Sequence, residues 1–142
     1  MSAFEATTEI KAPAERVWAV LSAVEAWSQW MPTVSSVRPL REAPLQVGRR
    51  YRVTQPKLRP TVWTVTAVEP DRRFEWRAKS LGMELLADHV IESRGPTAAQ
   101  VRLRFEFKGL VGVLLGVAFG ALTRNYLRQE AQALKYRAEE GK

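Results

Sequence analysis

The sequence predicts an α+β fold in which a curved antiparallel sheet carries a long C-terminal helix on one face. From about residue 34 to residue 108, short runs of alternating apolar and polar residues are separated by Gly and Pro turns, as is typical of antiparallel strands. Residues 110–122 are then almost wholly apolar, with glycines at 112, 116 and 120, and lead into an amphipathic basic helix. Glycines on one helix face leave space beneath it, so the sequence predicts an internal apolar cavity.

The chain is predicted to begin with one strand and two short helices. Residues 4–11 alternate Phe, Ala, Thr and Ile with Glu, Thr, Glu and Lys, which indicates a strand with one buried face. Pro13 suits the first turn of a helix, and apolar residues follow it at helical spacing. Ser22 and Glu25 form a candidate capping box for a second short helix, which would carry Trp27 and Trp30 and end at the next proline.

Six further strands are predicted, which with the first make a seven-stranded antiparallel sheet. Each run is rich in strand-forming residues or alternates apolar with charged residues, and turn residues such as Asp71, Gly82 and Gly95 separate them. The predicted strands cover residues 34–40, 50–55, 61–68, 74–79, 83–92 and 101–108. The long helix, residues 112–139, must bury its apolar face on this sheet.

Length and composition limit the classes of protein that the chain can belong to. Its 142 residues suit one domain, residues 1–142, and are too few for two ordinary domains. The absence of cysteine excludes disulfides, thiolate metal sites and a cysteine nucleophile. With one histidine, no phosphate-binding glycine loop and no nucleophile elbow, neither a metal site nor a cofactor is expected.

The net charge of +7 could attract nucleic acid, anionic lipid or an acidic partner. The arginines, however, are scattered over strands and turns, so a basic solvated surface is expected and nucleic-acid binding is not. The apolar run over residues 110–122 has 13 residues, whereas a membrane-spanning helix needs about 20. Because the first residues lack the pattern of a secretory signal, we expect a cytoplasmic protein.

Three segments resemble a known family. Residues 10–18 (IKAPAERVW), residues 27–32 (WSQWMP) and residues 63–74 (WTVTAVEPDRRF) are similar to the corresponding segments of polyketide cyclase/dehydrase-like proteins in the START-like, or SRPBCC, superfamily. The resemblance covers essentially the whole chain. It implies the helix-grip fold, in which a seven-stranded antiparallel sheet curls around a long C-terminal helix over a deep cavity for apolar or aromatic ligands. Members include aromatase/cyclases, lipid carriers and hormone receptors.

The candidate ligand contacts are aromatic and apolar residues expected to face this cavity. The resemblance implies that Trp30 and Met31 lie at its mouth, although Trp27 and Trp30 could instead only fix the second helix to the sheet. Alternation along the strands indicates inward positions for further candidates, as core or as cavity wall. These are Tyr51, Trp63, Trp76, Leu85, His89 and Phe105.

His89 and Tyr51 are the candidates for polar chemistry. His89 shares a strand face with apolar residues, so it could donate to a ligand carbonyl or move a proton near neutral pH. The alternative, which we favour, is a core histidine hydrogen-bonded to a neighbour. Tyr51 could assist proton transfer, and with Gln55 and Thr8 it could orient a ligand.

The glycines at 112, 116 and 120 have three possible explanations. They could allow close packing on the sheet, leave space for a ligand, or form a dimerisation face of the small-xxx-small type. Leu115 and Phe119, beside them, are the expected apolar ligand contacts on the helix. The protein could accordingly be a monomer or a homodimer.

Three functions follow from these features. The first is binding of an apolar or aromatic small molecule, lipid-like or polyketide-like, in the cavity. The second is a cyclase, aromatase or dehydratase that holds a polyketide-like chain in a reactive conformation. The third is a module that contacts a membrane surface or another protein, which the basic surface and the apolar helix start suggest but do not favour.

Overall fold

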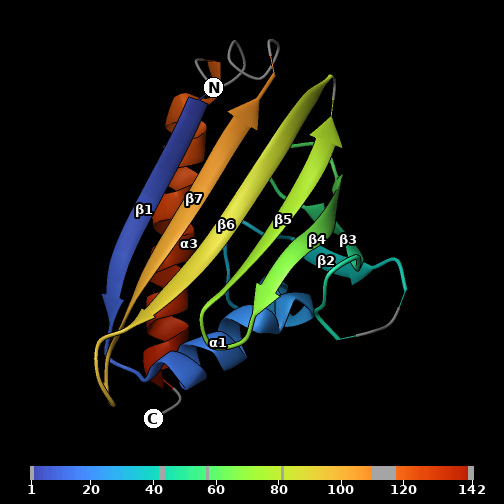
Figure 1. Ribbon diagram of the computed structural model, residues 1–142. Helices are drawn as coiled ribbons and strands as arrows, with labels where there is room; N and C mark the ends of the chain where they lie inside the picture. The colour runs from blue at the N-terminus through green and yellow to red at the C-terminus, as the bar shows by residue number, and fades with distance from the viewer. Residues whose placement is uncertain (1, 42–43, 57, 81, 110–117, 141–142) are drawn as a thin grey trace.

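A seven-stranded antiparallel sheet forms the frame of the protein (Figure 1). The computed structural model describes residues 2–41, 44–56, 58–80, 82–109 and 118–140. The strands lie in the order β1-β7-β6-β5-β4-β3-β2, so each strand from β2 to β6 pairs with the next one in the chain, and β1 pairs with β7. Their bounds are β1 Ser2–Ile10, β2 Ser36–Pro39, β3 Arg50–Thr54, β4 Thr61–Glu69, β5 Arg73–Ser80, β6 Met83–Ser93 and β7 Ala99–Lys108.

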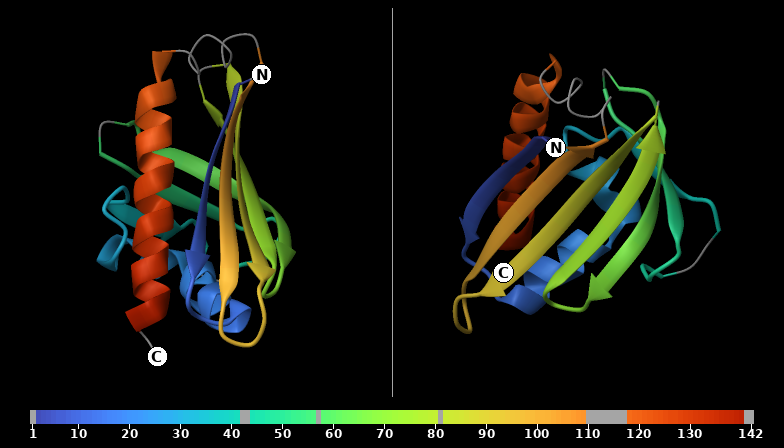
Figure 2. Two further views of the ribbon diagram at one scale, coloured as in Figure 1. Left: turned by 90° about the vertical axis from the view of Figure 1, so that its left-hand side faces the viewer. Right: turned by 45° about the horizontal axis from the view of Figure 1, so that its top comes forward.

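Within the described residues, three helices accompany the sheet. The α-helix α1 (Ala14–Ser22) and the 3-10 helix η1 (Val24–Gln29) connect β1 to β2, and α1 lies across one end of the sheet (Figure 1). The long helix α3 (Gly120–Glu140) packs mainly against β1, with further contacts to β7 and α1. Figure 2 shows α3 standing on one face of the sheet. Because α3 covers mainly β1, the inner faces of strands β3 to β6 are not covered by it and face the space beside the helix.

Alternation along the strands decides which side chains enter this space. Tyr51 and Val53 of β3 are buried. Arg50, which precedes them, and Arg52, which lies between them, are exposed. The same alternation holds on β5, where Phe74 is 0% exposed. The predicted α+β fold, with its seven-stranded antiparallel sheet, two short helices after the first strand and long C-terminal helix, is confirmed.

The second short helix differs from the prediction. It is a 3-10 helix that ends at Gln29, with Trp30 as its C-cap, and its N-cap is Ala23 with no side-chain cap. The predicted capping box of Ser22 and Glu25 is therefore wrong. Because a single residue separates the two helices, Ser22 still belongs to the last turn of α1 and lacks the extended backbone that an N-cap needs.

The strand predicted over residues 34–40 is also shorter in the structure, where β2 covers Ser36–Pro39. The amide of Val34 donates to the carbonyl of Met31 at 3.2 Å, so this residue belongs to the turn after η1. Pairing with β3 begins only beyond it. The sequence pattern, which counts apolar residues, does not distinguish a buried turn residue from a strand residue.

Gly120 is the one glycine of the predicted helix face that the structure describes. A Cβ atom there would lie 3.4 Å from two ring carbons of Phe4 on β1. The guanidinium carbon of Arg124 lies 4.9 Å from the centre of the same ring. This is ordinary van der Waals contact, so Gly120 packs on β1 but the packing does not require a glycine there. Gly112 and Gly116 lie outside the described residues.

Candidate functional site

A cavity of about 390 Å³ lies between the inner face of the sheet and α3. Strands β3 to β7 form one wall, α3 forms the other, and the β3–β4 loop contributes Leu58 and Arg59. The lining is mainly apolar, with a few polar side chains placed among aromatic and aliphatic ones. The sheet contributes Val53, Thr61, Trp63, Trp76, Met83, Leu85, Ala87, Asp88, His89, Leu103, Arg104, Phe105 and Phe107, and α3 contributes Leu122, Thr123, Tyr126, Leu127 and Glu130.

Three aromatic rings from strands β4, β5 and β7 form a continuous part of the wall. Trp63 of β4 and Trp76 of β5 stack with ring centres 5.8 Å apart and an interplanar angle of 29°. The ring of Phe105 on β7 meets Trp63 edge-on at 5.9 Å. Because side chains of one face recur every second residue, the strand pattern alone places these rings on the same surface. They offer a ligand a flat apolar wall.

The structure places six of the predicted ligand residues on the cavity surface. These are Trp63, Trp76, Leu85, His89, Phe105 and Phe119. Tyr51 and Met31 are buried but do not line the cavity, and Trp30 lines a different hollow. Leu115 lies outside the described residues. The strand positions thus come together, whereas the predicted mouth residues do not join them.

His89 is a buried neutral histidine. Its Nδ1 lies 3.1 Å from the carbonyl oxygen of Phe74, which can only accept, so Nδ1 carries the proton and donates it. The imidazole also stacks on the Phe74 ring at 4.1 Å and 12°. Burial, partly offset by the hydrogen bond to Phe74, lowers the pKa of His89 to about 4.

These contacts correct the predicted roles of His89. A group with a pKa of about 4 does not exchange a proton with a ligand near neutral pH. In its neutral form the remaining ring nitrogen, Nε2, accepts hydrogen bonds and does not donate to a carbonyl. The favoured alternative, a histidine hydrogen-bonded to a neighbour, describes what the structure shows.

Tyr51 belongs to the core behind the cavity wall. Its side chain is 1% exposed, and its ring contacts Trp76 at 6.0 Å. Burial, and after it the charge of Glu25, raises the pKa of Tyr51 above its usual value of 10. A hydroxyl that is harder to ionise and lies outside the cavity surface is poorly placed for the proton transfer predicted for it.

Trp30 and Met31 lie away from the cavity. Met31 is 4% exposed and belongs to the core. Trp30 and Pro32 line a second, more open hollow of about 600 Å³ together with the outer side of α3. The neighbouring Trp27 does line the cavity, and its Nε1 donates to the carbonyl of Leu21 at 2.9 Å. Trp27 therefore fixes η1 to the preceding helix and contributes a ring to the cavity wall.

Glu130 of α3 is the polar cavity residue that the sequence analysis missed. Its Oε2 accepts a hydrogen bond from Oγ1 of Thr33 at 2.9 Å and a longer one from Nε2 of Gln55 at 3.5 Å. Burial raises the pKa of Glu130 from 4.5 to about 7, and the hydrogen bond from Thr33 only partly opposes this rise. The cavity thus contains a carboxyl group that changes its charge near neutral pH.

A signal for Glu130 does exist in the sequence. The buried residues of α3 include Leu127 and Leu134, and Glu130 follows the first by three positions and precedes the second by four. This spacing places it on the buried stripe of the helix. The sequence analysis describes this helix only as amphipathic and basic, which does not distinguish a single inward carboxylate.

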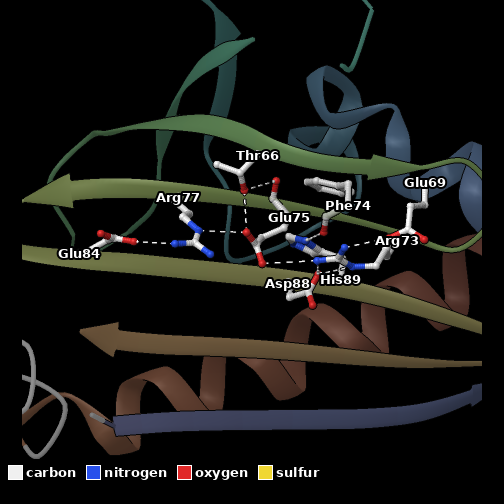
Figure 3. Close-up of polar contacts among 9 residues, drawn as sticks. All are labelled: Thr66, Glu69, Arg73, Phe74, Glu75, Arg77, Glu84, Asp88 and His89. Atoms are coloured by element: carbon white, nitrogen blue, oxygen red, sulfur yellow. Dashed lines mark hydrogen bonds and ion pairs between the residues drawn. The ribbon is translucent and has the colours of Figure 1, made fainter. Parts of the chain in front are cut away.

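The opposite face of the sheet carries an ion-pair network (Figure 3). Arg73 contacts Glu69 at 2.9 Å and Asp88 at 3.3 Å. Arg77 contacts Glu75 and Glu84, each at 3.0 Å. Glu84 and the carboxylate of Asp88 thus belong to this network, although Asp88 is also among the residues at the cavity surface. Their partners are supplied by neighbouring strands, so the network joins β4, β5 and β6 on the solvated face.

Among the described residues, no group of three His, Asp or Glu side chains could hold a metal ion. Within the same residues, no helix is both long and apolar enough to cross a membrane.

A seven-stranded antiparallel sheet with a C-terminal helix over an apolar cavity defines the helix-grip class. The sequence profile of the polyketide cyclase/dehydrase and lipid transport family matches residues 1–139, and the chain belongs to this family. A comparison with curated protein sequences gave no match.

Solved structures of the same fold include enzymes and a protein described only by its superfamily. The Zhui aromatase/cyclase from a Streptomyces species is 19% identical with a TM-score of 0.79, over 97% of this chain and 93% of that one. A START superfamily protein from Mycobacterium smegmatis is 19% identical with a TM-score of 0.75, and each chain is fully covered. A norcoclaurine synthase from Thalictrum is 14% identical with a TM-score of 0.74, over 98% and 94% of the two chains. At these identities the likeness shows the fold.

Proposed function

We propose that this protein binds one apolar or aromatic small molecule in the cavity between the sheet and α3. The observation that carries the proposal is a cavity of about 390 Å³ with a mainly apolar lining and few polar groups. Cavities of about 300–1,000 Å³ with this character are typical ligand sites. Each Å² of apolar surface that a ligand buries contributes about 25 cal/mol, so binding needs no special chemistry.

The residues that contact the ligand are proposed from those that line the cavity. We assign apolar contact with the ligand to Trp63, Trp76, Leu85, Phe105 and Phe119, which all line the cavity. Phe119 is 41% exposed, so it lies where the cavity meets solvent. The other four residues lie on strands that are fixed by pairing with their neighbours, which makes this wall rigid.

Cyclisation or dehydration of a polyketide-like substrate is the alternative, and it fits the aromatase/cyclase among the structures with this fold. The two residues predicted to transfer protons in such a reaction do not support it. His89 is neutral down to a pH of about 4, and Tyr51 does not line the cavity. Binding is therefore the function that we adopt.

The remaining proposals concern the compartment, the oligomeric state and the partners of the protein. We propose a cytoplasmic protein, monomer or homodimer, with a small-molecule partner and no nucleic-acid partner. In support, arginines of the outer sheet face such as Arg73, Arg77 and Arg104 are held in ion pairs with neighbouring carboxylates, so they do not form a free basic stripe.

Filling the cavity tests the proposed function. Ala87 lines the cavity and lies on β6 opposite Trp76 of β5 and Phe105 of β7. We expect Ala87→Phe to place a phenyl ring where the ligand binds and to weaken binding of 2-(2-naphthyl)ethanol, a neutral apolar probe, about tenfold or more. Isothermal titration calorimetry measures the affinity.

Ala121→Phe is the matched control, because Ala121 is exposed on α3 and does not line the cavity. It should bind the probe as the unmodified protein does. The proposal is contradicted if the unmodified protein binds no such probe and yields no small molecule on extraction and mass spectrometry. Equal affinity of the probe for Ala87→Phe and the unmodified protein would also contradict it.

A further inference from the structure

The hairpin of strands β2 and β3 carries a cluster of arginines on the outer face of the sheet. Residues 36–54 contain five arginines, no lysine and one acidic residue, Glu42. Four of these arginines are exposed, namely Arg38, Arg41, Arg50 and Arg52. Arg50 and Arg52 alternate with the buried Tyr51, so they lie on the face that points away from the cavity.

The strand register brings these arginines together without opposite charges. Arg38 of β2 lies directly opposite Arg52 of β3, and Arg50 is two residues away on the same face. On β4, the residues opposite Arg50 and Arg52 are Thr64 and Val62, which carry no charge. Like charges directly opposite each other in a sheet repel, since their side chains start only about 5 Å apart. Among the described residues, none of the four exposed arginines forms an ion pair.

The rest of the outer face is built differently. Arg73, Arg77 and Arg104 each contact a carboxylate at 2.9–3.0 Å, so the sheet supplies counter-ions elsewhere. Charged side chains on an edge strand prevent pairing with another sheet, which would explain one charge on β2 but not the two on β3. The cluster thus keeps a repulsion that the fold does not neutralise, and an anionic partner would remove it.

Two exposed aliphatic side chains accompany the arginines. Leu40 is 46% exposed and Val47 is 63% exposed, the largest fraction among the exposed large apolar residues that the structure describes. The amide of Leu40 donates to the carbonyl of Arg50 at 3.0 Å. Beside Val47, the amide of Gly48 donates to the carbonyl of Val65 at 2.8 Å, so backbone hydrogen bonds hold both positions. Figure 1 shows the chain between β2 and β3 projecting beyond the body of the sheet.

We propose that this hairpin surface docks on an anionic lipid membrane. It consists of Arg38, Leu40, Arg41, Val47, Arg50 and Arg52. Cations near such a bilayer are attracted to its anionic head groups, while exposed aliphatic side chains enter the boundary between head groups and acyl chains. The inference goes beyond the proposed function, because it concerns the outer face of the sheet and not the cavity.

The composition of the surface favours a membrane over other polyanions. Single-stranded nucleic acids bind on aromatic rings, and the one aromatic residue of the hairpin, Tyr51, is buried. Duplexes are held by phosphate contacts with cations, to which Leu40 and Val47 add nothing. Protein partners insert anchor side chains into pockets, whereas the four arginines line neither of the two hollows described above. A membrane uses both the cations and the aliphatic side chains.

Co-sedimentation of the full chain with lipid vesicles tests the inference. Vesicles of phosphatidylcholine with about 30% phosphatidylserine are compared with vesicles of phosphatidylcholine alone. We expect the protein to bind the anionic vesicles about tenfold or more tightly than the neutral ones at about 50 mM salt. Most of this difference should be lost at about 1 M salt, where charges are screened over a few ångströms.

A double variant locates the binding surface. Arg38→Gln with Arg52→Gln removes two charges that repel each other, so we expect it to fold and to bind the anionic vesicles about tenfold or more weakly. The matched control is Arg102→Gln with Arg128→Gln, which removes the same net charge from exposed positions on β7 and α3. Its affinity should fall by about threefold at most.

A fluorescent label reports whether the hairpin enters the membrane. The chain contains no cysteine, so Val47→Cys provides a single site for the environment-sensitive dye NBD. We expect the dye at residue 47 to brighten on the anionic vesicles, because it moves from water into the less polar boundary of the bilayer. The same dye on Ala121→Cys, an exposed position on α3, should not respond.

Equal binding to neutral and anionic vesicles, or binding to neither, overturns the inference. An equal loss of affinity in the two double variants also overturns it, because net charge alone would then explain the binding. If the protein binds the vesicles but the dye at residue 47 does not brighten, another surface faces the membrane and the inference is wrong. Displacement from the vesicles by a DNA duplex or by polyglutamate at equal anion concentration would identify a different partner. None of these results bears on the cavity, so the proposed function is decided by its own test.

Discussion

Replacing Phe74 by alanine is expected to lower the free energy of unfolding by about 3–5 kcal/mol. The side chain is 0% exposed and stacks on His89 at 4.1 Å. Its ring also contacts Trp27 at 6.1 Å and Trp76 at 5.3 Å. Because these neighbours are large rigid rings on separate elements, they cannot collapse into the space left behind. Urea unfolding followed by circular dichroism measures the loss.

Tyr136→Ala is the matched control, since it removes an aromatic ring that is 56% exposed on α3. Its effect should stay within about 0.5 kcal/mol. The loss in Phe74→Ala is a large part of the roughly 5–15 kcal/mol that a domain of this size has. A loss below about 1 kcal/mol would show that the aromatic cluster around Phe74 is not tightly packed.

Glu130→Gln is expected to stabilise the protein at pH 8 by about 3 kcal/mol and to have little effect near pH 4. Glu130 has a pKa of about 7 in the folded protein, against its usual 4.5. The folded state therefore holds a proton that the unfolded chain has lost between these values, so the stability that Glu130 contributes falls as the pH rises through this window. Above about pH 7 the half-buried carboxylate is charged and its penalty is present, and glutamine removes it.

His89 produces the opposite slope in almost the same window. Its pKa is about 4 in the folded protein, against its usual 6.5, so the unfolded chain binds the extra proton and stability rises with pH up to about 6.5. The two groups thus oppose each other in the unmodified protein, and Glu130→Gln should reveal the rise due to His89. Urea unfolding at several pH values measures both curves. If the difference in free energy of unfolding between Glu130→Gln and the unmodified protein does not change with pH, the raised pKa assigned to Glu130 is contradicted.

The sheet wall of the cavity was predictable because it depends on a two-residue period. Trp63, Trp76 and Phe105 come to one surface since each lies on the inward phase of its strand, and strand pairing brings the three strands together. Trp30 and Met31 were placed at the cavity mouth by resemblance alone, and no periodic pattern supported that position. They lie just after a 3-10 helix whose short turns the sequence pattern does not fix.

The polar part of the site was harder to predict for a physical reason. The roles of His89 and Glu130 depend on partners far away in the sequence, the carbonyl of Phe74 for one and Thr33 with Gln55 for the other. A pattern along the chain reports which way a side chain points. It does not report which hydrogens are already donated, and that decides what the cavity can recognise.

The double use of Trp76 restricts how ligand preference can change during evolution. Its ring lines the cavity and also contacts Trp27, Tyr51, Trp63 and Phe74, so a substitution there alters the fold and the site together. Leu122, Thr123 and Tyr126 face the same cavity from α3 without belonging to this ring cluster. New specificities are therefore expected to arise from the helix, while the sheet side is inherited nearly unchanged.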